Sequence, residues 1–103
     1  MIGSNIIGND LVEAAAEFAA AKARLELWMG HIDPPLPLRR QFEIGRAASE
    51  AVRTIYESWI KFESAHRSAG GKVAMVDDER SVLLVTIRKA TAELGRIPEG
   101  RGE

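Results

Sequence analysis

A long proline-free stretch, from Leu38 to Ser68, is the feature that most constrains the fold. Its apolar side chains recur every three or four residues, which predicts one continuous helix. At 1.5 Å per residue this helix would be about 46 Å long. The apolar positions are Ala48, Val52, Ile55, Trp59 and Phe62, widened by Ile44, Ala47, Ala51 and Ile60. So long an apolar face must be covered by another helix of the chain or by a second copy of it.

A first helix is expected over about residues 10–29. Two interleaved series of residues are each spaced by seven: Leu11, Phe18 and Leu25, and Ala14, Ala21 and Trp28. This spacing is typical of a heptad seam. Asp10 is expected to be the N-cap, with Glu13 completing a capping box, and Gly30 is expected to end the helix.

A proline-rich connector separates these two helices. Residues 31–37 read His-Ile-Asp-Pro-Pro-Leu-Pro, and each proline removes an amide donor and favours extended backbone before it. Pro37 is well placed to open the long helix, which we expect to end at residues 69–71, Ala-Gly-Gly.

A third helix is expected over about residues 78–94. Its buried stripe consists of Leu83, Ile87, Ala90 and Leu94. The carboxylates of residues 77–79 suit the positive end of a helix dipole, and Gly95 and Pro98 should end the helix.

These elements predict a single all-α domain over residues 1–103. It would be an antiparallel helical hairpin, about 10–29 and 38–68, with a third helix and a flexible tail over 96–103. Hydrophobic residues make up 46% of the chain, but many are alanines, and there is no cysteine. The core should therefore be modest, and we expect further burial by oligomerisation. The interface candidates are Phe18, Leu25, Trp28, Val52, Ile55, Trp59 and Phe62.

Charge is distributed unevenly, although the formal total is only −1. Residues 1–35 carry two basic and five acidic side chains, and residues 36–72 carry seven basic and four acidic ones. Arg39, Arg46 and Arg53 are seven residues apart, so they share one face of the long helix, with Arg40 beside them. Arginines in such a row could contact DNA phosphates without reading sequence.

An alternative interpretation of the arginines is a solvated helix face. Three acidic residues stand four positions after them, giving the possible ion pairs Arg39–Glu43, Arg46–Glu50 and Arg53–Glu57. Such pairs support an exposed helix without any ligand. Repetition of the row in an oligomer would favour the DNA interpretation.

The sequence offers little for catalysis. His31 and His66 are the only histidines and stand far apart, so no metal-binding motif is formed. No glycine-rich phosphate loop is present, and residues 77–79 are explained by the helix terminus. We therefore expect no enzymatic activity, no metal and no cofactor.

The N-terminal residues lack the basic region of a signal peptide. No stretch approaches the roughly 18 apolar residues that would cross a bilayer. A cytoplasmic protein without a membrane partner is expected.

The C-terminal half resembles the small terminase subunits of bacteriophages and their counterparts in gene transfer agents. The resemblance covers about residues 38–101 and includes the aromatic patch at residues 56–59 and the glycine break at residues 70–71. In that family the last helix ends in a Leu-Gly-x-x-Pro-x-x-Arg signature, matched here by Leu94, Gly95, Pro98 and Arg101. Arg96 and Ile97 replace the family's usual Leu and Thr before the proline.

The resemblance implies a non-enzymatic DNA-packaging adaptor. Such subunits assemble into homo-oligomeric rings, engage double-stranded DNA and stimulate a large terminase subunit, an ATPase and nuclease, in the bacterial host cell. The motor-contact candidates are Arg96, Ile97, Pro98 and Arg101. Residues 1–35 hold one helix rather than a helix-turn-helix domain, which favours non-specific DNA contact.

Two other classes remain open. One is a small helical interaction protein or regulator of another kind. The other is a secreted helical hairpin of the WXG type, suggested by Trp28-Met29-Gly30 at the expected turn between helices.

Overall fold

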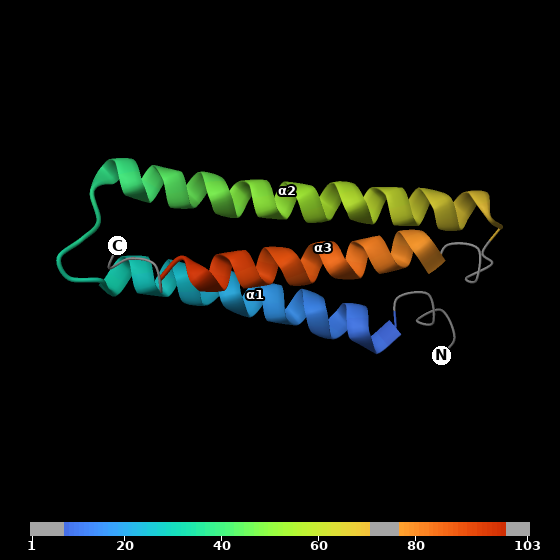
Figure 1. Ribbon diagram of the computed structural model, residues 1–103, viewed down its shortest axis with the longest axis horizontal. Coiled ribbons are helices and arrows are strands. Elements are labelled where there is room, and N and C mark those ends of the chain that lie inside the picture. Colours follow the sequence, from blue (N-terminus) through green and yellow to red (C-terminus); the bar gives the residue numbers. More distant parts are fainter. Residues whose placement is uncertain (1–7, 71–76, 99–103) are drawn as a thin grey trace.

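The computed structural model describes residues 8–70 and 77–98 of the chain. It forms three helices, α1 (Gly8–His31), α2 (Leu38–Ser68) and α3 (Asp77–Arg96), and the described residues include no strand. The helices lie side by side in a bundle of 54 × 23 × 18 Å (Figure 1). α2 runs antiparallel to both α1 and α3. The predicted all-α class, with a hairpin and a third helix, is confirmed.

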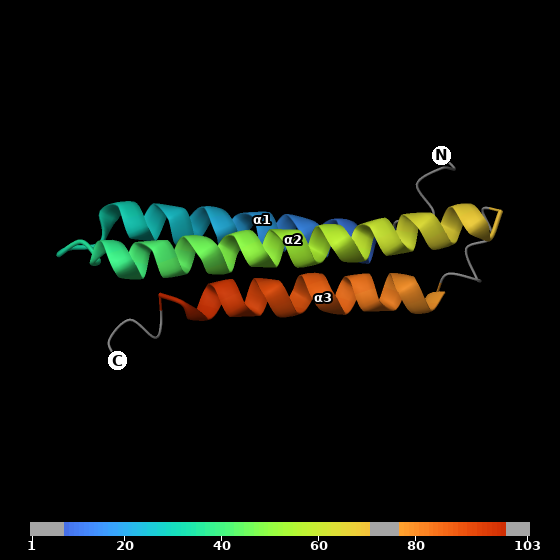
Figure 2. The same cartoon turned by 90° about the horizontal axis from the view of Figure 1, so that it is seen from above.

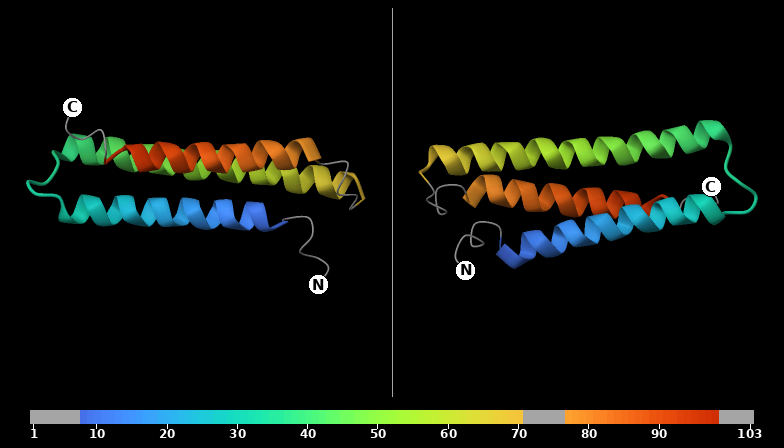
Figure 3. Two further views of the ribbon diagram at one scale, coloured as in Figure 1. Left: turned by 60° about the horizontal axis from the view of Figure 1, so that its bottom comes forward. Right: turned by 180° about the vertical axis from the view of Figure 1, so that it is seen from behind.

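α3 is the helix that packs most closely against the other two. Its backbone approaches α1 and α2 along much of its length, whereas α1 and α2 approach each other much less. Figure 2 shows α3 to one side of the α1–α2 pair, and Figure 3 shows α1 and α2 diverging. Ala14, Ala21 and Ala90 are buried, and such small side chains let helix backbones come close together.

The core consists of two clusters along the bundle, each drawing on all three helices. The first contains Leu11, Ala14, Phe62, Leu83 and Ile87. The second contains Ala21, Leu25, Ile44 and Leu94. Phe18 packs against both clusters and joins them. Phe62 is 0% exposed, and its ring packs against Trp59 with the centroids 5.7 Å apart.

The long helix has the predicted bounds. Pro37 precedes it in extended geometry, and the Pro37 carbonyl accepts a hydrogen bond from the Gln41 amide at 3.0 Å. Ala69 follows the last turn, and Gly70 adopts a left-handed φ of 67°. Glycine reaches that conformation without the steric cost that a side chain would add. Gly71 lies outside the described residues.

The predicted capping box is wrong. α1 begins at Gly8, two residues before Asp10, so Asp10 lies within the first turn. Its carboxylate accepts hydrogen bonds from the Leu11 amide, at 2.9 Å, and from the Arg80 guanidinium. Asp10 therefore ties the start of α1 to the start of α3. Gly8 has a φ of 75°, and an added Cβ there would meet the Arg80 guanidinium at 2.5 Å.

The predicted helix stops at Gly30 and Gly95 are also wrong. α1 continues to His31 and α3 to Arg96. Neither glycine has a positive φ, so neither makes the left-handed turn that ends a helix. The connector follows directly, and its Asp33–Pro34 bond is cis.

Leu83→Ala is expected to lower the free energy of unfolding by about 2–5 kcal/mol, because it empties a packed site that three helices share. Leu83 is 2% exposed, whereas Val85 on the same helix is 64% exposed. Val85→Ala is the control and should change that free energy by about 0.5 kcal/mol or less. Urea unfolding followed by circular dichroism measures both. Equal losses would contradict the central position of α3.

The Asp10–Arg80 contact should make stability depend on pH. The Arg80 hydrogen bond holds the pKa of Asp10 below its ordinary value of 3.8. A carboxylate with a lowered pKa stabilises the folded state above its unfolded-state pKa, and this contribution is lost as the pH falls through the folded-state value. Wild type should therefore exceed Asp10→Asn in unfolding free energy at neutral pH. The difference should shrink as the pH falls below about 4 and the Asp10 carboxylate takes up a proton. A difference that stays constant over this range would contradict the assignment.

Candidate nucleic-acid interface and apolar groove

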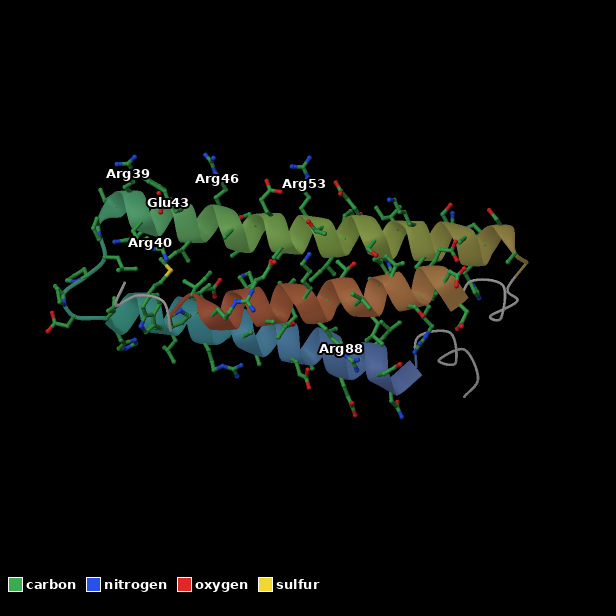
Figure 4. The ribbon with its side chains drawn as sticks, viewed as in Figure 1. Arg39, Arg40, Glu43, Arg46, Arg53 and Arg88 are labelled. Carbon is green, nitrogen blue, oxygen red and sulfur yellow. The ribbon has the colours of Figure 1, made fainter. Side chains whose placement is uncertain are left out.

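Three arginines form a row along α2. Arg39, Arg46 and Arg53 are exposed, and their side chains project from the same side of the helix, away from α1 and α3 (Figure 4). Two helical turns separate neighbours, so the row has steps of about 10.5 Å. Arg40, one position along, extends toward the side of α2 that faces the other helices. We call Arg39, Arg46 and Arg53 the arginine row.

Only one of the three possible ion pairs is formed. Arg53 lies 3.4 Å from Glu57, and it also reaches Glu50 at 3.8 Å. Glu43 instead pairs with Arg40, at 3.4 Å. These contacts are exposed, and exposed pairs contribute little free energy, so Arg40 and Arg53 can turn to another anion.

Arg39 and Arg46 are left without an acidic partner within residues 8–70 and 77–98. The ion-pair pattern that would make the row an ordinary solvated face is therefore incomplete at two of its three positions. A free guanidinium can bind one phosphate with two parallel hydrogen bonds. Arg88 is also exposed, but it lies on α3 away from the row (Figure 4).

An apolar groove runs between α1 and α2, and α3 forms part of its floor. Its wider part is lined by Leu11, Val12, Ala15, Val52, Ile55, Tyr56, Trp59, Leu83 and Ile87. It continues between Lys22, Leu25, Glu26 and Met29 of α1 and Ile44, Gly45, Ala48, Ser49 and Val52 of α2. Val52 belongs to both parts, so we treat them as one α1–α2 groove. The groove exists because α1 and α2 are each packed against α3 more closely than against each other.

The seven interface candidates are divided between the core and the surface. Leu25 and Phe62 are buried within the chain itself. Phe18, Trp28, Ile55 and Trp59 are half-buried against the two clusters. Val52 remains 42% exposed. Within one chain, α1 and α3 together cover the side of α2 that carries Ile44 and Phe62.

Several exposed apolar residues of α2 were absent from the predicted interface. Phe42 is 74% exposed, Leu38 is 70% exposed and Tyr56 is 60% exposed. The sequence carries only an interrupted signal, because positions 38, 42, 45, 49, 52 and 56 share one face with steps of four and three but include Gly45 and Ser49. These positions turn to solvent because they lie beside the core series, on the side away from α3.

The C-terminal candidates lie at the end of the bundle where α2 begins (Figure 1). Arg96 is the last residue of α3, and Ile97 packs against the second core cluster. Pro98 lines a pocket together with Trp28, Leu94 and other residues from the ends of α1 and α3. Arg101 lies outside the described residues.

The placement of Trp28-Met29-Gly30 differs from that expected of a WXG-type hairpin. These residues lie in the last turns of α1, which continues to His31, and not in the turn between helices.

The described residues present two surfaces, the exposed arginine row and the apolar α1–α2 groove. In the part of the chain that the structure describes, no group of three or more His, Cys, Asp or Glu side chains could hold a metal ion. None of the helices is both long and apolar enough to cross a bilayer, as far as the described residues extend. No protein-family model, curated protein or solved structure matches the chain.

Proposed function

We propose that this chain is a non-enzymatic DNA-packaging adaptor similar to small terminase subunits. It self-associates into a ring, contacts double-stranded DNA through the arginine row and acts on a large terminase motor in the bacterial cytoplasm. The observation that carries the proposal is the pair of exposed guanidinium groups, Arg39 and Arg46, that have no acidic partner among the described residues.

Contact with DNA through this row is electrostatic and weak for one chain. Each phosphate neutralised by an arginine releases condensed counterions, so the affinity falls as salt rises. Two or three contacts in one protomer give only a small gain. Several rows in one assembly act together, because binding of the first raises the effective concentration of the rest.

Residues 8–70 and 77–98 form no helix-turn-helix motif that would place the row in a major groove, where arginine can read guanine. The three helices run side by side, whereas a helix-turn-helix motif crosses its two helices at about 90–120°. Glu43, Glu50 and Glu57 lie beside the row on α2. Their negative charges would repel the phosphates on both sides of a DNA groove if α2 were to enter it, so we expect the row to contact the outside of the duplex. Backbone contact without sequence preference suits a protein that must engage DNA of any sequence.

The motor would be contacted through the C-terminal end of α3. Leu94 and Pro98 of the resemblance signature line one pocket together with Trp28 at this end of the bundle. Arg39 and Arg40 begin α2 at the same end. A motor docked there would lie next to DNA bound on the row.

A second candidate is a helical interaction protein that does not bind DNA. The apolar α1–α2 groove favours it, because an amphipathic helix of a partner could fill such a groove. Co-purification distinguishes the two functions. A nucleic-acid-dependent ATPase as the main partner supports the packaging adaptor, and a partner without nucleic-acid activity supports the alternative.

Arg39→Glu/Arg46→Glu should weaken binding to duplex DNA and lower its salt dependence. Loss of two phosphate contacts reduces the slope of log affinity against log salt by about two for each protomer that contacts the DNA. The control Arg88→Glu/Lys89→Glu changes the net charge equally on α3, where both residues are exposed, and should retain the wild-type slope. Fluorescence anisotropy at several salt concentrations measures both. Equal weakening by the two double variants would reject the row as the DNA contact.

A further inference from the structure

We propose that the α1–α2 groove is filled by a second copy of this chain in a two-fold dimer. In this dimer, α2 of each copy packs along the outer edge of α1 of the other. The inference gives a geometry to the self-association in the proposed function, and it does not depend on DNA contact.

Most of the large exposed hydrophobic side chains lie on the two helices that border the groove. They are Val12 and Leu27 of α1 and Leu38, Phe42, Val52, Tyr56 and Ile60 of α2. Among the described residues, only Val82 and Val85 of α3 join them. The five α2 side chains lie on one side of the helix in two groups, Leu38 with Phe42 and Val52 with Tyr56 and Ile60, separated by the small residues Gly45 and Ser49. We call these five side chains the α2 ridge, which runs beside the groove. An apolar patch of this kind on a soluble chain marks a contact surface.

The matching surface on α1 is made of small side chains. Ala16, Ala19 and Ala23 are exposed and lie between Val12 and Leu27 on one side of the helix; we call these alanines the α1 edge. Bulky side chains of one helix pack best against small ones of its neighbour, because the two surfaces then interdigitate without voids. The α2 ridge therefore fits the α1 edge of another copy better than it fits a second α2 ridge.

Charge favours the same pairing. α1 carries four acidic and two basic side chains, a net charge of −2, and α2 carries four acidic and six basic ones, a net charge of +2, with histidines neutral. Laying α1 on the partner's α2 brings opposite charges together. The other two-fold arrangement lays α1 on α1 and α2 on α2, so like charges would meet across the interface.

α1 of one copy packs against α2 of the other when the two-fold axis of the dimer runs parallel to the long axis of the bundle. α1 then runs antiparallel to the partner's α2, and the four helices form a square of antiparallel neighbours, the arrangement of a four-helix bundle. Each α3 stays on the outside. The face that carries α1 and α2 is the one spread out in Figure 1, at most about 54 Å long and 23 Å wide, which leaves room for the roughly 800 Å² that each partner buries in a stable interface.

The arginine row remains accessible in this dimer. Arg39 follows Leu38 in the sequence and Arg53 follows Val52, so the row stands one position beyond the ridge, at the margin of the interface. The dimer consequently presents two rows. A ring would be assembled from such dimers through other surfaces, because a two-fold interface closes on itself.

Engineered cysteines test the register, since the chain has none of its own. Lys22 and Ser49 line the same part of the groove, so Ala23 of one copy should lie level with Ser49 of the other. Ala23→Cys and Ser49→Cys are single variants at exposed positions. Mixed and oxidised, they should give a disulfide-linked dimer at twice 11.3 kDa, because the two Cα atoms would come within about 7 Å.

Each single variant alone should give little cross-linked product, since equivalent residues lie on diagonally opposite helices. Cross-linking of Ala23→Cys alone or of Ser49→Cys alone, at the yield of the mixture, would overturn the pairing. So would cross-linking of Ala23→Cys with Val85→Cys, which indicates a head-to-tail ring and would leave the proposed function intact.

Native mass spectrometry supplies a second measurement. The wild-type chain should be dimeric or a multiple of the dimer at about 10 μM, a concentration at which a specific protein interface is populated. Tyr56→Glu should raise the dissociation constant at least tenfold, whereas Val85→Glu on α3 should leave it unchanged. A wild-type monomer at this concentration refutes the dimer, as does an equal effect of the two variants. Arg39→Gln/Arg46→Gln removes two charges of the row without giving α2 a net negative charge and should still dimerise, so a failure of DNA binding is recognised separately.

Discussion

The packing of α3 against both other helices is the contact on which the rest of the structure depends. Leu83 and Ile87 meet Phe62 and Leu11 in one cluster, and Leu94 meets Leu25 and Ile44 in the other. Each cluster draws on three helices, and the backbones of α1 and α2 approach α3 much more than each other, so α3 is the main link between them. The Asp10–Arg80 ion pair fastens α1 to the beginning of α3. Because α3 occupies one side of the hairpin, the opposite side keeps an open groove.

The sequence predicts the helices well where backbone chemistry marks their ends. Pro37 and Gly70 bound α2, one by fixing its own φ and the other by adopting a left-handed φ, and both effects are local. The predicted helix ends at Gly30 and Gly95 were wrong, because glycine inside a helix costs only about 1 kcal/mol and the neighbouring hydrogen bonds continue through it. The predicted capping box at Asp10 was wrong for a different reason. Its carboxylate is used by Arg80, seventy residues away in the sequence, and no local pattern shows such a contact.

The candidate surfaces could be predicted only in part. Periodicity places Val52 and Phe62 on apolar faces alike, yet Phe62 is fully buried and Val52 is 42% exposed, because only the position of α3 decides which side of α2 is covered. The arginine row was visible as a seven-residue spacing. Its ion pairs were not, since Glu43 can reach either Arg39 or Arg40, and side-chain geometry selects Arg40. The exposed residues Leu38 and Phe42 needed a second apolar series to be recognised beside the stronger one.

The position of the arginine row beside the α2 ridge links the two proposals physically. Both surfaces are carried by α2, a rigid helix of 31 residues, so the interface that fixes α2 against a partner also fixes the direction and spacing of its arginines. A free chain offers DNA one row in a random orientation. A dimer offers two rows in a constant relation, and the second contact forms at the effective concentration set by the first. Association and DNA binding would then strengthen each other by the same factor, as linkage requires of two coupled equilibria. Under the two proposals together, such an adaptor would hold DNA firmly only when assembled, because each contact made by a single row would be weak.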